Sequence, residues 1–385
     1  MSKVVNFIKK LKIGNYANYA VIAVVMLYFA IITFSGGRVD SSTLYLLEKM
    51  AISIILAVSL SMVVGFLGEL SLGHAGFMCV GAYLGGKISV LLEPALGNSV
   101  LNFVVSLIVG AVVAALCGVV IGIPALRLRG DYLAIVTLAF GEIVKSLFLN
   151  SSDESFGGAT GLSTPRFDKK YFFIIAFVLV LVTLAVIQNF LRSKHGRAVT
   201  SIRDNEIAAR ATGINVTKYK LLAFIISATF AGVAGVLYSF SNYNVQSVKF
   251  GYNYSIEILV MVVLGGMGSI NGSIIAAALI TFLNTKLATI LTGDLAVLQN
   301  LIYAVILILI VIYNNAPALK SFREKYNLNA FVKWVFAKTP FFKTPENDAA
   351  KWDVVPTKIE MNEVLSIDVV PQDKKGNTGN GGDER

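Results

Sequence analysis

Residues 192–218, with the sequence RSKHGRAVTSIRDNEIAARATGINVTK, form the longest polar run before the C-terminal tail. Strongly apolar segments flank this run at 171–191 and 219–240. A basic loop between two membrane-spanning segments is retained on the cytoplasmic side of the membrane. The run therefore predicts a protein that crosses a membrane on both sides of a cytoplasmic loop.

The same loop carries the signals of a short helix between Asp204 and Gly213. Aspartate is a preferred residue for capping the N-terminus of a helix, and glycine favours the left-handed turn that ends one. Ile207, Ala208 and Ala211 then share one face. Such a helix suits docking into a groove on a partner protein, because small side chains allow the backbones to approach closely. The alternative interpretation is an ordinary solvated connecting loop.

The composition of the whole chain is that of a membrane protein. Of 385 residues, 56% are hydrophobic and only 15% are charged. Soluble domains have about 45–50% apolar and about 25% charged residues. A spanning helix needs about 20 apolar residues, and the chain before residue 316 supplies about ten such helices. We therefore predict an all-α, polytopic membrane helix bundle.

Positive charge in this chain is explained by membrane topology. The net charge of +10 lies largely in loops and tails. If the N-terminus is cytoplasmic, the alternating segments place Arg127, Arg129 and the loop 192–218 on the cytoplasmic side, as the positive-inside rule requires. Both termini are then cytoplasmic, and we expect no nucleic-acid partner. The ten predicted segments are 19–34, 44–65, 78–92, 100–123, 133–149, 171–191, 219–240, 255–265, 274–287 and 298–313.

The first and last parts of the chain allow separate interpretations. A basic stretch precedes segment 19–34 and small residues follow it, so a cleaved secretory signal is an alternative to a first span. At the other end, the composition divides a membrane-spanning domain, 1–316, from a polar tail, 317–385. Within this tail, residues 320–334 are compatible with an amphipathic helix at the lipid headgroups. We expect the remainder of the tail to be disordered.

Signatures of catalysis and of metal binding are absent from the sequence. Cys79 and Cys117 lie in apolar runs and have the character of packing residues. His74 and His195 are too few and too far apart for a zinc site. No P-loop, GxSxG or HExxH pattern occurs. We expect no catalytic residue, no metal and no cofactor, so any ATP would be bound by another chain.

Two glycine-rich stretches interrupt the apolar segments. Residues 68–77, GELSLGHAGF, predict a helix break or a helix start near a permeation path, because non-helical backbone at membrane depth must be satisfied by protein or a water-filled cavity. His74 is a candidate pathway residue; the alternative is a histidine hydrogen-bonded where helices pack. Residues 265–273, GGMGSINGS, join two short apolar runs and predict closely packed broken helices.

Polar side chains inside segment 133–149 form a second set of candidates. A carboxylate in a membrane-spanning segment is costly unless it is paired, protonated or hydrated. Glu142 and Lys145 stand three residues apart and can pair on one helix face. We identify Thr137 and Glu142 as candidate residues of a translocation pathway. The alternative for Glu142 is a packing anchor that is paired with Lys145.

Four blocks of sequence resemble one known family. They are 71–77 (SLGHAGF), 130–143 (GDYLAIVTLAFGEI), 206–209 (EIAA) with Gly213 after it, and 262–269 (VVLGGMGS). In this order they resemble permeases of branched-chain amino-acid ABC importers, over roughly residues 40–315. The resemblance departs from the general importer pattern at the acidic residue of the cytoplasmic loop. That residue would stand at Ile207, whereas this chain has Glu206.

The resemblance implies a type II ABC importer-like fold and a function. The chain would be the permease subunit of an ATP-driven importer in a bacterial inner membrane, moving branched-chain or related hydrophobic amino acids inward. Its partners would be two ATPase subunits, a second homologous permease, an extracytoplasmic substrate-binding protein and membrane lipid. The loop would couple to the ATPase through Asp204, Glu206, Ala208, Ala209 and Gly213.

Two other functions remain as alternatives. Related permeases carry urea or short amides, and the residues of the pocket would decide between these substrates and amino acids. A self-contained secondary transporter would instead use Glu142 or His74 as a proton or ion site. Such a carrier needs no docking helix, so the loop 192–218 discriminates between the two mechanisms.

Overall fold

The computed structural model describes residues 13–34, 40–97, 99–128, 130–165, 169–290, 304, 305 and 308. The chain divides into two units, 1–316 and 317–385, and all described residues belong to the first. The predicted interfacial helix at 320–334 and most of the last predicted span lie outside the described residues.

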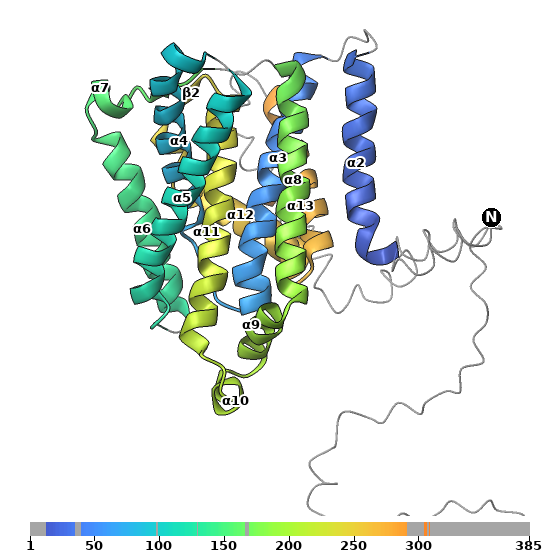
Figure 1. The fold of residues 1–385 in the computed structure, drawn as a ribbon, viewed down its shortest axis with the longest axis vertical. Coiled ribbons are helices and arrows are strands. Elements are labelled where there is room, and N and C mark those ends of the chain that lie inside the picture. The colour runs from blue at the N-terminus through green and yellow to red at the C-terminus, as the bar shows by residue number, and fades with distance from the viewer. Residues whose placement is uncertain are drawn as a thin grey trace, which may run out of the picture. The chain divides into compact units, whose positions relative to one another are not determined.

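The first unit is a bundle of long helices, as predicted (Figure 1). Apolar segments form helices in a membrane because a helix satisfies all its backbone hydrogen bonds internally. The long helices are α2 (Ile13–Phe34), α3 (Ser41–Ser61), α4 (His74–Leu96), α5 (Val100–Ala125), α6 (Asp131–Leu149), α8 (Lys169–Arg192), α11 (Val216–Ser241) and α13 (Ile270–Ile290), and the shorter α12 (Tyr252–Gly265) accompanies them.

Shorter elements connect the long helices. A two-stranded antiparallel ladder pairs Leu162 with Val245 and Ser163 with Asn244, so it ties two connections at one end of the bundle together. The polar loop 192–218 forms its own helices at the opposite end (Figure 1). The short elements are η1 (Met62–Leu67), α7 (Asp153–Phe156), β1 (Leu162–Ser163), α9 (Lys194–Asp204), α10 (Glu206–Ala211), β2 (Asn244–Val245) and η2 (Ser247–Phe250).

The membrane character of the bundle is clear from its helices. Among the described residues, 7 helices are long and apolar enough to cross a membrane, and two shorter apolar helices accompany them. Each predicted segment up to residue 287 coincides with a described helix. The predicted total of ten is not established, because residues 298–313 are described only at 304, 305 and 308.

Helix α3 is the buried centre of the bundle. In the most apolar 18-residue stretch of α3 and η1, 89% of the residues are buried inside the protein. A helix that is apolar all round belongs in a core. It continues into the π-helix η1, which ends at Gly68 with φ 79°. Residues 68–73 are not helical, and α4 begins at His74. The predicted break in this stretch is therefore confirmed.

Helices α4 and α11 pack backbone to backbone through glycines. A Cβ atom at Gly81 would lie 2.3 Å from the carbonyl oxygen of Gly232, and one at Gly235 would lie 2.0 Å from that of Met78. Small residues serve this purpose in membrane proteins, where van der Waals packing replaces the hydrophobic driving force.

Helices α12 and α13 form the broken pair that the second glycine-rich stretch predicted. With 14 residues, α12 extends about 21 Å, which is too short for the roughly 30 Å apolar core of a bilayer. A Cβ atom at Gly265 would lie 2.4 Å from the backbone of Gly272. One at Gly65 would lie 2.4 Å from the backbone nitrogen of Gly268, so η1 packs directly on the turn between the two helices.

A matched pair of glycine substitutions tests the α4–α11 contact. We expect Gly81→Ala to lower the free energy of unfolding by about 1–3 kcal/mol, because the added methyl group overpacks a backbone contact. Gly141→Ala is the control, since its Cβ would meet its nearest atom at 3.8 Å. The measurement is unfolding of the purified chain in lipid–detergent micelles; equal stability of the two variants would contradict the packing.

Candidate functional site

The polar loop 192–218 folds into two helices, α9 and α10, and α10 lies at the tip of the bundle (Figure 1). The prediction that Asp204 caps the N-terminus of this short helix is wrong. Asp204 is the last residue of α9, and its carboxylate pairs with Arg203 at 2.8 Å. Asn205 caps α10 instead, because its backbone is extended and its side-chain oxygen accepts a hydrogen bond from the Ala208 nitrogen at 3.0 Å.

The end of α10 follows the sequence prediction. Gly213 has φ 85°, a left-handed conformation that few other residues adopt. The Ile214 nitrogen donates to the Ala209 carbonyl at 3.1 Å, which closes the helix. Within α10, Ala209 is buried, whereas Ala208 is exposed and Ile207 is 82% exposed. An apolar side chain thus projects from the tip of this loop.

Glu206 connects α10 to the membrane part of the protein. Its carboxylate accepts hydrogen bonds from Arg210 at 2.8 Å and from Lys220 Nζ at 3.2 Å. Lys220 Nζ also donates to Glu69 at 2.5 Å. The side chain of Lys220 is only 5% exposed, and that of Glu69 only 13%. This Glu69–Lys220–Glu206 cluster joins the break before α4, the start of α11 and the loop helix.

Arg203 makes a second connection from the loop. Its Nη1 donates to the Gly65 carbonyl at 3.1 Å, inside the π-helix η1. A Cβ atom at Gly68 would lie 2.7 Å from the Arg203 side chain, and one at Gly268 would lie 3.6 Å from its Nη1. Arg203 therefore contacts both η1 and the turn between the broken helices α12 and α13.

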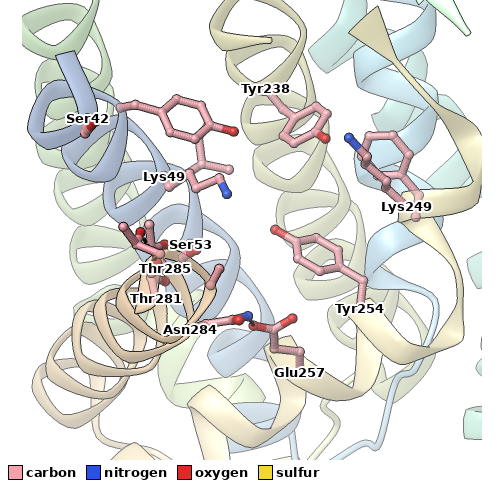
Figure 2. A pocket seen from close by; sticks show the side chains of 15 residues that line it. Ser42, Lys49, Ser53, Tyr238, Lys249, Tyr254, Glu257, Thr281, Asn284 and Thr285 are labelled. Atoms are coloured by element: carbon pink, nitrogen blue, oxygen red, sulfur yellow. Dashed lines mark hydrogen bonds between the residues drawn. The ribbon is translucent and has the colours of Figure 1, made fainter. Parts of the chain in front are cut away.

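A cavity of about 570 Å³ lies at the opposite end of the same helices (Figure 2). By the predicted topology, this end faces outside the cell. The walls come from α3, α11, η2, α12 and α13. They combine aromatic, hydroxyl, amide and charged side chains: Ser42, Tyr45, Lys49, Ile52, Ser53, Tyr238, Lys249, Phe250, Tyr254, Glu257, Thr281, Asn284, Thr285, Ala288 and Thr289.

His74 and Thr137 lie in helix packing, away from the cavity lining. His74 is buried, and its Nε2 lies 2.8 Å from the Ser59 hydroxyl of α3. The buried Thr137 hydroxyl accepts a hydrogen bond from the Leu72 nitrogen at 3.0 Å. Both residues therefore fix the broken stretch 68–73 against α3 and α6, which favours the packing alternative for His74.

Glu142 joins α6 to the start of α12. It pairs with Lys145, as the sequence alternative proposed. Its other oxygen accepts a hydrogen bond from the Tyr252 nitrogen at 2.7 Å, at the N-terminus of α12. A carboxylate stabilises a helix at this end. Glu142 lines an open groove on α6 and not the cavity of Figure 2, so it positions the helix that carries Tyr254 and Glu257.

The sequence analysis did not identify the charged lining of the cavity. Lys49 and Glu257 stand near the outer ends of apolar segments, and a charge at such a position is the signal that points to them. Lys220, a lysine at the beginning of segment 219–240, carries the same signal. Within the described ranges, no group of three or more His, Cys, Asp or Glu residues is placed to hold a metal ion.

Comparison with known proteins places the chain among transport permeases. The profile of a family described as "Branched-chain amino acid transport system / permease component" matches residues 42–312. The permease protein LivM of a high-affinity branched-chain amino acid transport system is 38% identical in Salmonella typhimurium and 39% in Escherichia coli K12, each over 278 residues. The ribose import permease RbsC of Escherichia coli is 25% identical over 321 residues.

Coverage differs between these relatives. The LivM matches cover 64% of this chain and 62% of each relative, so the chain spans about three-fifths of those proteins. The RbsC match covers 77% of this chain and 92% of that protein. No solved structure matches the chain significantly. With its apolar helices, the chain is a multi-pass protein of the inner membrane, and it belongs to the family of branched-chain amino acid transport permeases.

Proposed function

We propose that this chain is the permease subunit of an ATP-driven importer that moves branched-chain or related hydrophobic amino acids into the cell. The observation that carries the proposal is the link from α10 to the bundle through Glu206, Lys220 and Glu69. A helix that displays an exposed isoleucine at the membrane surface suits a groove on an ATPase. No secondary carrier needs such a helix.

The proposed partners follow from an importer in which this chain forms the path and other subunits supply the energy. Two ATPase subunits would dock on the cytoplasmic side, one on this chain and one on a second, homologous permease. A substrate-binding protein would deliver the amino acid to the outer face. ATP would be bound by the ATPases alone, so this chain would carry neither a cofactor nor a catalytic residue.

The structure suggests how ATP binding would reach the substrate path. Movement of α10 pulls on Lys220 of α11 through Glu206, and on the break before α4 through Glu69. Arg203 transmits the same movement to η1 and to the turn between α12 and α13. Helices α3, α11, α12 and α13 also form the walls of the cavity. A displacement of the loop would therefore alter the cavity at the other end.

The preference for amino acids rests on the relatives and on the cavity. The two LivM proteins share 38% and 39% of aligned residues with this chain, against 25% for the ribose permease. The cavity also contains two lysines and a glutamate. Urea and short amides have no charged groups, so they would gain less from these side chains than an amino acid, which carries a carboxylate and an ammonium group.

Substitution of Gly213 tests the docking role of α10. We expect Gly213→Val to abolish ATP-dependent leucine uptake, because the φ of 85° at this position disfavours any side chain and the end of α10 would be distorted. The chain should still fold, because no atom lies within 4 Å of the added Cβ. The measurement is uptake into vesicles that contain the complete importer. Gly130→Val is the matched control, since Gly130 also has a positive φ and open surroundings but lies outside the loop. Uptake that survives in Gly213→Val would contradict the role.

Substitution of Glu206 tests the charged link. We expect Glu206→Gln to leave the ATPases bound and to lower leucine uptake per ATP roughly five-fold or more, because coupling free energies are typically about 1–3 kcal/mol. Asp131→Asn, an exposed acid at the start of α6, is the control and should behave as the parent protein. The ratio of uptake to ATP hydrolysis is measured in the same vesicles. An unchanged ratio in Glu206→Gln would show that the link transmits nothing.

A further inference from the structure

The outer cavity contains side chains of both charges, two lysines and a glutamate. We propose that it binds the amino acid as a zwitterion. Lys49 and Lys249 would hold the α-carboxylate, and Glu257 would hold the α-ammonium group. This inference rests on the proposed function and specifies its substrate site.

The two lysines are available to an anionic ligand. In the described part of the chain, neither Lys49 nor Lys249 has a carboxylate within salt-bridge distance. Lys49 Nζ lies instead over the ring of Tyr45, 4.7 Å from its centroid. Figure 2 shows Lys49 and Lys249 on different sides of the cavity, one from α3 and one from η2. A carboxylate between them would meet two charged donors.

The carboxylate of Glu257 supplies the opposite charge. Its Oε1 accepts a hydrogen bond from the Asn284 amide at 3.0 Å, so α13 fixes the orientation of the side chain (Figure 2). The ring of Tyr254 lies near Glu257 in the same view. A carboxylate beside an aromatic ring suits an ammonium group, which binds to both.

A buried hydroxyl in the cavity lining gives independent evidence for a polar ligand. Thr281 is only 6% exposed, and its Oγ1 has no hydrogen-bond partner among the described residues. A buried polar atom without a partner is destabilising, because it has given up its hydrogen bonds to water and gained none in return. A carboxylate oxygen or an ammonium group of a ligand would satisfy it.

The rest of the lining suits an aliphatic side chain. Ile52, Phe250 and Ala288 provide apolar surface beside the charged groups. The volume of about 570 Å³ lies within the usual range of small-molecule sites, about 300–1,000 Å³. The combination fits a small amino acid with an apolar side chain better than a sugar or a free cation.

Protection of an introduced cysteine tests the site directly. Thr285 lines the cavity and is half-buried, so a Thr285→Cys variant can report on its occupancy. The native Cys79 and Cys117 are replaced by alanine in the same full-length chain, which is placed in lipid nanodiscs. The rate of maleimide labelling is then measured with leucine, with isoamylamine, which lacks the carboxylate, and with 4-methylpentanoate, which lacks the ammonium group.

We expect leucine to slow labelling at a concentration at least about ten-fold lower than either analogue. Each analogue lacks one of the two charged groups, and hydrogen bonds that involve charged groups are stronger than hydrogen bonds between neutral groups. The double variant Lys49→Met, Lys249→Met should lose the preference for leucine over isoamylamine. Glu257→Gln should lose the preference over 4-methylpentanoate. Lys286→Met is the matched control: Lys286 is exposed on α13 but does not line the cavity, so the full preference should remain.

Three results would overturn the assignment. These are equal protection by the three compounds, no protection by leucine, and unchanged preferences in the lysine and glutamate variants. Gel filtration of each variant shows whether it is folded, and the lysine and glutamate variants test the site separately. Labelling needs neither ATP nor an ATPase. A failure of the predicted protection is therefore distinguishable from a failure of ATP-driven uptake, which would count against the proposed importer itself.

Discussion

A buried ammonium group shared by two carboxylates is the interaction on which the proposed mechanism depends. Lys220 Nζ is held by Glu69 from the break before α4 and by Glu206 from α10. Removing one partner from a buried charge cluster typically costs about 3–5 kcal/mol, because the remaining charge loses its compensation. Three chain segments are therefore constrained to move together. A surface salt bridge, worth about 0–1 kcal/mol, would not impose this constraint.

Close backbone packing joins η1 to the broken pair α12–α13 at the same end of the bundle. Gly65 of η1 lies against Gly268, and Gly265 lies against Gly272, so the end of α3 and the broken pair α12–α13 contact one another without intervening side chains. Packed interiors switch between discrete arrangements because they resist gradual deformation. Helices α3, α12 and α13 also line the cavity, which is why the proposed mechanism connects a shift of the loop to the proposed substrate site.

The sequence predicted the features that local rules control. Glycine-dense, semipolar stretches within apolar segments indicated the breaks at 68–73 and 266–269, because membranes penalise exposed backbone. The three-residue spacing of Glu142 and Lys145 indicated their pair, and Gly213 indicated the end of α10. The capping residue was misassigned to Asp204 because aspartate and asparagine are similarly favoured at that position, and backbone geometry decides between them.

Contacts between distant segments could not be predicted in this way. Lys220 and Glu69 are separated by 151 positions, and no local spacing relates them. The cavity assembles Lys49, Lys249 and Glu257 from three separate elements. In the sequence, Lys49 and Glu257 were only charges near the ends of apolar segments, and Lys249 was a charge in a connecting loop. Helix packing, which a single sequence does not specify, gives these residues a common site.

The most direct measurement is the distance between spin labels at Ser42 and Thr289, which both line the outer cavity. It is made by double electron–electron resonance on the complete importer, with and without ATP. We expect ATP to shift this distance in the parent protein and to leave it unchanged in Lys220→Met. The same ATP-induced shift in Lys220→Met would contradict transmission through the buried lysine.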